Sequence, residues 1–271
     1  MGLLTFDLQA HRGGAGLAAE NSLRAFGLSL DLGVSTLETD VHITQDGQPV
    51  LSHERVLPDG EFIAWLPADR VPLPRLTDLI ALVEARGADV RLNIETKFDA
   101  VQPDEVAPRE RFAEVVCGML EEHGFAERAS VQSFDWHVLD LVARASPKIR
   151  LNVLTNIGYL EVGLPGASPW MAGVDVDDFG GDVVAAARHR GYSAMSPRHS
   201  LVTSEMVAEA HAAGLEVIPY TVDDPGVMRD LIGSGVDGLI TNRPDVLRAV
   251  LSELGLPLPE PCPARGRSGI A

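Results

Sequence analysis

The sequence is poor in cysteine, and Cys117 and Cys262 are the only two cysteines among its 271 residues. The first falls in a predicted helix and the second in a segment rich in proline. We therefore expect no structural disulfide, which excludes the class of small domains held together by such bonds. A chain with this cysteine content fits a reducing compartment, and we expect a cytoplasmic location.

Long apolar runs are also absent. No stretch of about 18 consecutive apolar residues occurs, which argues against a membrane-spanning helix. The segment from Met1 to Asp7 has no basic residues followed by a long apolar run, so we expect no signal peptide.

Basic residues are scarce, because 22 Lys and Arg stand against 39 Asp and Glu and leave a net charge of −17. Such a chain repels nucleic acid and anionic membranes, so we expect no nucleic-acid partner. Binding of a phosphate group would need a local group of cations or a bound metal ion. Arg12 and Lys97, with a metal ion held by carboxylates, could provide this positive charge.

The chain does contain a regular alternation of short apolar segments with amphipathic ones, which is typical of parallel strands joined by helices. Eight such strands would close a TIM (β/α)8 barrel, and 271 residues suffice for one. We predict one barrel domain over residues 1–255 and a Pro/Gly-rich tail, ordered only in part, over residues 256–271. The predicted strands are residues 6–10, 36–43, 90–94, 130–133, 149–154, 193–196, 216–220 and 238–241.

Two carboxylates share one face of the strand predicted near residues 36–44. Alternation places Glu38, Asp40 and His42 on one side, with the two carboxylates roughly 6–7 Å apart along the strand. Like charges this close repel unless a cation or water lies between them. The pattern therefore predicts a divalent metal site, and the alternative is the solvated face of an edge strand.

Two histidines follow short apolar segments. His11 ends the segment 6–10 and His53 ends the segment 49–52. Parallel barrels carry their catalytic groups where strands end, so both histidines are candidates for the functional site.

These elements together resemble the glycerophosphodiester phosphodiesterase family, a metal-dependent branch of the phospholipase-C-like phosphodiesterases with a TIM-barrel fold. The resemblance covers roughly residues 8–250 and departs from the usual pattern at Ala19, Glu54 and Asp223. None of these three departures removes a candidate acid, base or metal ligand. The matching motifs are His11-Arg12, Glu20-Asn21, Glu38-x-Asp40, Pro49-Val50 and His53, followed later by Glu95-x-Lys97.

The resemblance implies a role for each matching residue. Glu95 would be the third metal carboxylate beside Glu38 and Asp40, and Lys97 a phosphate contact; the alternative is a Glu–Lys surface pair of little energetic value. An oxygen-only ligand set favours Mg²⁺ or Ca²⁺ over Zn²⁺. His11 and His53 fit the general acid and base of phosphodiester cleavage, with Arg12 at the nonbridging oxygens.

Other residues are weaker candidates. Glu20 is expected to orient the site, whereas helix capping would explain Asn21 fully. His42 is expected either to contact substrate or metal, or to support residues that do. The residues expected to line the pocket from strand ends are Gln132, Phe134 and Tyr220.

The resemblance implies hydrolysis of glycerophosphodiesters to sn-glycerol 3-phosphate and an alcohol, through attack by a hydroxyl of the glycerol itself. A lysophospholipase-D-like activity is the alternative, and an apolar rim around Phe62 and Trp65 would favour it. The segment 57–74 that carries both rings is either a plain surface loop or a loop that covers the substrate. A barrel that binds without catalysis would require the loss of a histidine or a metal carboxylate.

Overall fold

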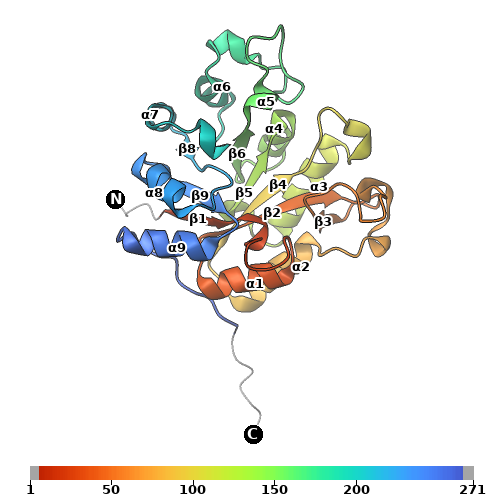
Figure 1. Cartoon of the computed structure of the whole chain (residues 1–271). Helices are drawn as coiled ribbons and strands as arrows, with labels where there is room; N and C mark the ends of the chain where they lie inside the picture. Colours follow the sequence, from red (N-terminus) through yellow and green to blue (C-terminus); the bar gives the residue numbers. More distant parts are fainter. Residues whose placement is uncertain (1–5, 265–271) are drawn as a thin grey trace.

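The computed structural model describes residues 6–264 and is a barrel of eight parallel strands surrounded by helices (Figure 1). Its strands follow the order β8-β7-β6-β5-β4-β2-β1-β9, which confirms the predicted TIM barrel. The parallel strands are β1 (Asp7–Ala10), β2 (Thr36–Ile43), β4 (Arg91–Thr96), β5 (Ala129–Ser133), β6 (Arg150–Thr155), β7 (Ala194–Pro197), β8 (Glu216–Val217) and β9 (Gly238–Thr241).

The barrel closes between β8 and β9 through individual backbone hydrogen bonds. The amide of Asp237 donates to the carbonyl of Val217 at 2.9 Å, and that of Ile240 donates to Pro219 at 2.9 Å. The predicted strand 216–220 is shortened to β8, since Pro219 has no N–H to continue a ladder. A single bridge between Arg198 and Tyr220 extends the pairing toward the mouth of the barrel.

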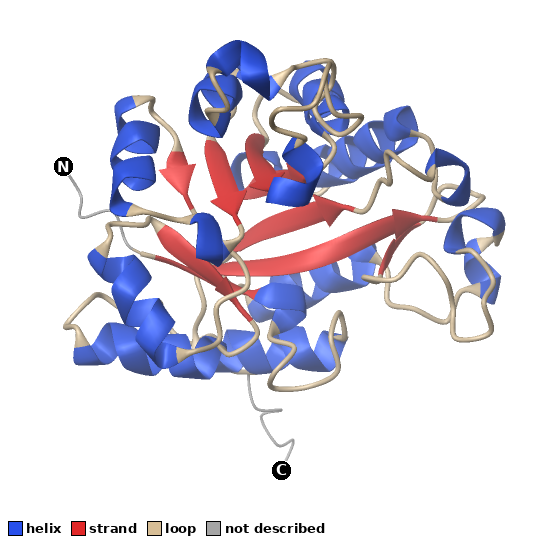
Figure 2. Ribbon diagram, turned by 45° about the horizontal axis from the view of Figure 1, so that its top comes forward, coloured by secondary structure: helices blue, strands red, loops and turns tan. Residues whose placement is uncertain are grey.

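Helices cover the outside of the strands (Figure 2). In α1, the hydroxyl of Ser22 caps the first turn by accepting from the amide of Ala25 at 3.2 Å, and Phe26 and Leu30 lie one turn apart on the buried face. Each fully buried side chain of this size contributes about 1.5–3 kcal/mol of hydrophobic stabilisation. The helices are α1 (Leu23–Leu32), α2 (Leu76–Arg86), α3 (Arg109–Glu122), α4 (Trp136–Ala145), α5 (Ile157–Leu160), α6 (Val183–Arg190), α7 (Ser204–Ala212), α8 (Pro225–Gly233) and α9 (Pro244–Glu253).

One strand lies outside the barrel. β3 (Pro49–Leu51) pairs antiparallel with the end of β2, with Val41 opposite Leu51. His53 therefore follows an antiparallel strand outside the barrel and not one of the eight parallel strands. β2 is long enough to extend past the barrel mouth, and the chain then folds back along it, which returns His53 toward the barrel.

The segment 57–74 after β3 is an ordered insertion with its own apolar cluster. Two short 3-10 helices, Ile63–Trp65 and Ala68–Arg70, lie within it. The clustered side chains are those of Val50, Leu57, Ile63, Leu66, Val71 and Leu73. A segment with this much buried apolar surface holds a defined conformation beside the barrel mouth.

The first part of the predicted tail, through residue 264, packs against the barrel. Leu256 and Leu258 contact the main core, and Arg248 Nη1 donates to the carbonyl of Pro259 at 2.7 Å. The amide of Cys262 donates to the carbonyl of Leu30 at 2.7 Å. Residues 265–271 lie outside the described part of the chain, so the expected domain and tail boundaries stay a prediction.

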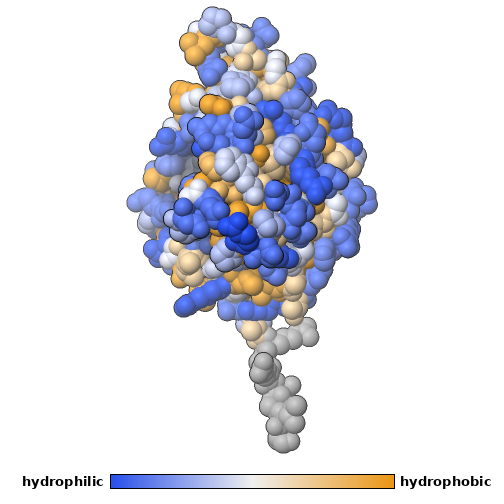
Figure 3. Space-filling model, turned by 90° about the vertical axis from the view of Figure 1, so that its right-hand side faces the viewer, coloured by the Kyte–Doolittle hydropathy of each residue, from blue (hydrophilic) through white to orange (hydrophobic). Residues whose placement is uncertain are grey.

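The surface seen in Figure 3 is mostly hydrophilic, with smaller apolar patches between the polar residues. Cys117 is buried and Cys262 half-buried, and neither forms a disulfide. Among residues 6–264, no helix combines the length and apolar character needed to cross a bilayer.

Candidate active site

Three carboxylates converge inside the barrel mouth. Glu38, Asp40 and Glu95 each offer an oxygen within 4.8 Å of the others. The ladder between β2 and β4 sets this arrangement, because it places Asp40 opposite Glu95. β2 is hydrogen bonded to β1 on one side and β4 on the other, and both of its carboxylates are fully buried. The alternative of a solvated edge strand is therefore wrong.

A tight turn after β1 supports this cluster from one side. Arg12 adopts a left-handed conformation with φ of 52°, and its backbone N–H donates to Glu38 Oε2 at 2.7 Å. Gly13 follows with φ of +78°, and a Cβ there would lie 2.7 Å from the Phe26 ring. Only glycine fits such a position without strain, so the turn and the position of Glu38 depend on it.

Asp40 is stabilised in its charged form. Burial alone would raise the pKa of its carboxyl, but Lys97, Arg12 and a hydrogen bond from Asn21 outweigh burial and lower that pKa to about 2. Arg12 Nε lies 3.1 Å from Asp40 Oδ2, and Lys97 Nζ lies 3.6 Å from Asp40 Oδ1. Asp40 is therefore ionised at neutral pH.

Asn21 has a different role from the expected helix cap. Ser22 caps α1, while Asn21 is buried and its Nδ2 donates to Asp40 Oδ2 at 2.9 Å. Its Oδ1 accepts from the hydroxyl of Thr39 at 2.8 Å, which fixes the amide orientation. Capping therefore does not explain Asn21, whose contacts hold Asp40 in place.

Glu20 reaches the site through Arg12. Its carboxylate accepts from Arg12 Nη1 at 2.8 Å, while the same guanidinium contacts Asp40 through Nε. Glu20 itself is exposed. This arrangement holds the guanidinium of Arg12 at the edge of the carboxylate cluster, which is consistent with the expectation that Glu20 orients the site.

The residues of the cluster fit a divalent cation. Burial, with Asp40 and Glu95 close by, raises the pKa of Glu38 well above its usual range, and burial also raises the pKa of Glu95. Because Glu20 also shares Arg12, four carboxylates meet the two cations Arg12 and Lys97, so carboxylates outnumber cations at the cluster. Asp40 Oδ1 is buried with no hydrogen-bond partner among the described residues. These oxygens are the hard ligands that Mg²⁺ and Ca²⁺ take.

Glu95 and Lys97 form an ion pair that lies inside the mouth. Lys97 Nζ donates to Glu95 Oε1 at 2.7 Å, and only 9% of the Glu95 side chain and 17% of the Lys97 side chain are exposed. The alternative of a Glu–Lys surface pair is therefore wrong. Although burial opposes it, the neighbouring carboxylates of Glu95 and Asp40 raise the pKa of Lys97, so its ammonium stays charged.

His11 is held by a residue from the opposite end of the chain. Its Nδ1 lies 2.7 Å from Asn242 Oδ1, and Asn242 Nδ2 donates to Asp223 Oδ2 at 2.8 Å. Since the Asp223 carboxylate can only accept, the Asn242 oxygen faces His11, and His11 Nδ1 carries the proton. Nε2 is then free to accept a proton. Burial, together with Arg12, lowers the pKa of His11 and keeps the ring neutral.

Sequence reasoning did not assign this role to Asn242 or Asp223. Asp223 is one of the three departures from the family pattern, and Asn242 directly follows the last predicted strand, 238–241. A contact across 231 positions becomes visible only when β9 lies beside β1.

His53 stands at the other side of the mouth. Its Nδ1 lies 2.7 Å from Glu54 Oε1, and the hydrogen bond from His53 lowers the pKa of the Glu54 carboxyl. The proton of His53 Nδ1 thus faces Glu54, and its Nε2 is available for exchange with a ligand.

His42 supports the chain that carries His53. Its Nε2 donates to the carbonyl of His53 at 3.4 Å, and it also borders the cavity at the barrel mouth. Burial, reinforced by Lys97, lowers the pKa of His42 to about 4, so the ring is neutral at physiological pH. The hydrogen bond from His42 helps to fix the turn that ends in His53. The amide of Ser52 supports the same turn by donating to the carbonyl of Asp40 at 3.2 Å.

A cavity of about 560 Å³ opens beside His53, Glu95 and Lys97. Phe134 lines it as expected, and Tyr220 packs edge-on against Phe134 with ring centroids 5.9 Å apart. Sequence reasoning missed Tyr159 and Trp170, which also line the cavity and come from the segment between the predicted strands 149–154 and 193–196.

Gln132 supports Glu38 from inside the barrel. Its Nε2 donates to Glu38 Oε1 at 3.0 Å, while its Oε1 accepts from Asn93 Nδ2 at 2.8 Å. Asn93 Nδ2 also donates to Gln9 Oε1 at 2.8 Å, and Gln9 Nε2 to Asp7 Oδ2 at 2.9 Å. This chain of amides fills the interior and fixes the rotamer of Glu38.

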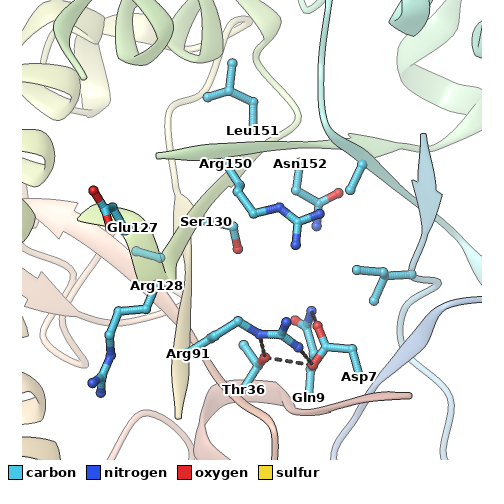
Figure 4. Close-up of a pocket in the computed structure, with 13 residues that line it drawn as sticks. Asp7, Gln9, Thr36, Arg91, Glu127, Arg128, Ser130, Arg150, Leu151 and Asn152 are labelled. Carbon is cyan, nitrogen blue, oxygen red and sulfur yellow. Dashed lines mark hydrogen bonds and ion pairs between the residues drawn. The ribbon is translucent and has the colours of Figure 1, made fainter. Parts of the chain in front are cut away.

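The amide chain ends at a small cavity of about 30 Å³ at the opposite end of the barrel. Figure 4 shows Arg91 and Arg150 extending into this space, with Asp7 and Thr36 beside Arg91. Each arginine already has a carboxylate partner: Arg91 lies 2.9 Å from Asp7, and Arg150 lies 2.7 Å from Glu216. A space of this size suits ordered water and not a substrate.

Comparison with known proteins gives a consistent result. The family model described as the glycerophosphoryl diester phosphodiesterase family matches residues 11–62 and 59–246. A glycerophosphodiester phosphodiesterase of Caldanaerobacter subterraneus is 26% identical over 258 residues, which cover 88% of this chain and 94% of that protein.

Solved structures agree on the fold. A Silicibacter pomeroyi protein named for glycerophosphoryl diester phosphodiesterase activity superposes with a TM-score of 0.78 at 27% identity, covering 93% of this chain and 95% of that one. An Oleispira antarctica phosphodiesterase, solved with the product sn-glycerol-3-phosphate, gives a TM-score of 0.73 at 20% identity and covers 90% of this chain and 96% of that one.

Proposed function

The chain belongs to the glycerophosphoryl diester phosphodiesterase family, and from this premise we propose that it hydrolyses glycerophosphodiesters to sn-glycerol 3-phosphate and an alcohol with the help of a divalent cation. The observation that carries the proposal is the buried cluster of Glu38, Asp40 and Glu95, flanked by Arg12 and Lys97. Arg12 and Lys97 each contact a carboxylate of this cluster, so the site combines ligands for a metal ion with cations for a phosphate group.

Glu38, Asp40 and Glu95 would hold the cation. When bound, Mg²⁺ or Ca²⁺ would supply positive charge to the phosphoryl oxygens, where charge develops in the transition state. Arg12 and Lys97 lie at the edge of the same cluster and would contact the remaining nonbridging oxygens. Both are kept charged by the carboxylates beside them.

The two histidines differ in their hydrogen bonds, and we assign their roles from this difference. His11 is neutral with Nε2 free, so it acts as the base that takes a proton from the attacking hydroxyl. His53 holds its Nδ1 proton toward the Glu54 carboxylate, which leaves Nε2 as the nitrogen that exchanges a proton with the substrate, and we assign His53 the acid role. His53 then gives its Nε2 proton to the leaving alkoxide as the bond between phosphorus and the alcohol oxygen breaks.

The attacking hydroxyl belongs to the glycerol moiety in our proposal. Its attack expels the alcohol and leaves a cyclic glycerol phosphate. Water then opens the ring, with the histidines exchanging roles, to give sn-glycerol 3-phosphate. All protons lost by the nucleophiles are returned to the leaving oxygens, so no further reactant is needed.

One observation favours a second candidate, a lysophospholipase-D-like activity. Trp65 is 56% exposed, and its ring centroid lies 4.3 Å from that of Phe62, which lines the cavity. An exposed aromatic side chain next to a cavity-lining one suits a substrate with an acyl chain. The third reading, an inactive barrel, is disfavoured because both histidines and all three carboxylates are present.

The experiment that tests the proposal compares glycerophosphocholine, glycerophosphoethanolamine and a lysophospholipid, each with Mg²⁺, Ca²⁺ or EDTA. We expect metal-dependent release of sn-glycerol 3-phosphate from the water-soluble diesters. Preferential cleavage of the lysophospholipid would favour the second candidate. Absence of metal-dependent cleavage of any diester would defeat both. For the compartment we propose the cytoplasm, which the two unpaired cysteines support.

A further inference from the structure

The cavity beside His53 extends well past the groups that we assign to the phosphate. It has a volume of about 560 Å³, and the part next to the carboxylate cluster is bordered by Glu95, Lys97 and His53. His11 does not border it. If His53 protonates the leaving alkoxide, the alcohol lies on the side of His53, and this cavity is where it is held.

One wall of the cavity is aromatic. Phe134 meets Tyr159 edge to face with ring centroids 4.8 Å apart, and Tyr159 stacks on Trp170 at 4.5 Å. The three rings come from the ends of β5 and β6 and the loop beyond, and Phe62 adds a ring from the insertion after β3. The electron-rich faces of such rings attract cations.

Within residues 6–264, no Lys or Arg of the protein lies over these rings. Among the described residues, Phe98 is the one aromatic side chain of the cavity that already carries a guanidinium, with Arg109 lying 4.2 Å above its centroid. Phe134, Tyr159, Trp170 and Phe62 have no such partner within the described part of the chain. The aromatic wall is therefore available to a cation that a ligand brings.

Acidic side chains also line the cavity. Asp99 and Glu105 share a single guanidinium, since Arg55 Nη1 lies 2.6 Å from Asp99 and Arg55 Nη2 lies 2.6 Å from Glu105. Glu54 adds a further carboxylate. Arg55 and the protonated His53 that the proposed mechanism requires offset two of these three carboxylates, and the remaining negative charge favours a positively charged ligand group in the cavity.

We propose that this cavity is a subsite for an alcohol that carries an ammonium group, with quaternary ammonium as its preferred form. This inference rests on the proposed function, and it adds the chemical class of the alcohol. An aromatic surface with nearby carboxylates recognises a quaternary ammonium through its charge, because such a group has no N–H to donate. A neutral alcohol of the same shape loses the electrostatic attraction and keeps only its apolar contact.

The test compares two substrates of equal shape. Glycerophosphocholine and glycerophospho-3,3-dimethylbutanol differ only by carbon in place of the charged nitrogen. We expect kcat/KM to be about tenfold higher for the choline ester, which corresponds to one cation–π contact in a partly desolvated site. Equal kcat/KM values for the two esters would overturn the subsite while leaving the proposed function intact. Failure to hydrolyse either ester would count against the proposed function itself.

Variants test whether the aromatic and the acidic side chains of the cavity cause the preference for the choline ester. Tyr159→Leu and Phe134→Leu should each reduce the ratio of the two kcat/KM values toward one, while Phe179→Leu, which removes a ring away from the cavity, should leave it unchanged. Glu105→Gln should reduce the ratio, and the exposed Glu110→Gln should not. The ratio cancels any loss of folded enzyme, since both substrates meet the same preparation. An unchanged ratio in Tyr159→Leu and Glu105→Gln would contradict the proposal.

Discussion

His11 Nδ1 lies 2.7 Å from Asn242 Oδ1, a contact that joins the end of β1 to the residue just after β9. It fixes which ring nitrogen of His11 carries the proton, because Asn242 is itself held by Asp223. The same contact lies where β1 and β9, the first and last strands of the chain, run side by side. The proposed base is therefore oriented by the last strand of the fold and not by its neighbours in sequence.

Asn242→Ala should lower kcat about ten- to a hundredfold with little change in KM, because the imidazole loses the group that selects its tautomer. Burial and Arg12 already lower the pKa of His11, and the Asn242 hydrogen bond opposes them. Its loss should lower that pKa further. A general base acts only in its unprotonated form, at pH values above its pKa. A lower pKa of His11 should therefore move the acidic limb of the kcat/KM profile to lower pH. A limb that stays in place, or moves to higher pH, would contradict this role for Asn242.

His11→Ala and His53→Ala should each lower kcat by about 10²–10⁴-fold, the range that a positioned acid or base contributes. The fold should survive, which circular dichroism and thermal unfolding can check. His137→Ala, at an exposed position on α4, is the matched control and should retain full activity. Near-normal turnover in either site variant would remove that histidine from the acid–base pair.

Asp40→Asn should weaken binding of Mg²⁺ or Ca²⁺ by at least about tenfold, as should Glu95→Gln, because each removes a charged ligand while keeping its shape. Calorimetry on the metal-free protein measures this without reference to activity. Asp178→Asn, at an exposed position, is the control. Binding that is equally tight in all of these proteins would place the cation elsewhere.

Gly13→Ala should lower the free energy of unfolding by about 2 kcal/mol, through both a left-handed backbone and contact with the ring of Phe26. Activity should fall with it, since the turn also positions His11 and Arg12. Gly60→Ala is a matched control, having φ of +87° with nothing within 4 Å of the added Cβ. Gly60→Ala should lower the free energy of unfolding only through its left-handed backbone, by about 1 kcal/mol. Equal losses in the two variants would show that the turn tolerates a side chain.

The sequence by itself determined the local features of this protein. Alternation within residues 36–43 placed Glu38 and Asp40 on one face, and β2 has those bounds in the structure. The periodic exchange of strands and helices indicated eight parallel strands, which the barrel has. Such features depend on residues a few positions apart, where backbone geometry alone relates the side chains.

Tertiary structure decided which distant residues meet. Asn21 and Gln132 hold the carboxylates, Asn242 holds His11, and the antiparallel β3 returns His53 to the mouth. Tyr159 and Trp170 reach the cavity from a segment without a clear pattern. These contacts depend on strand register, on closure of the barrel and on removal of water from the charged groups. None of these three is a property of a short stretch of sequence, because each arises only when the whole ring of strands has formed.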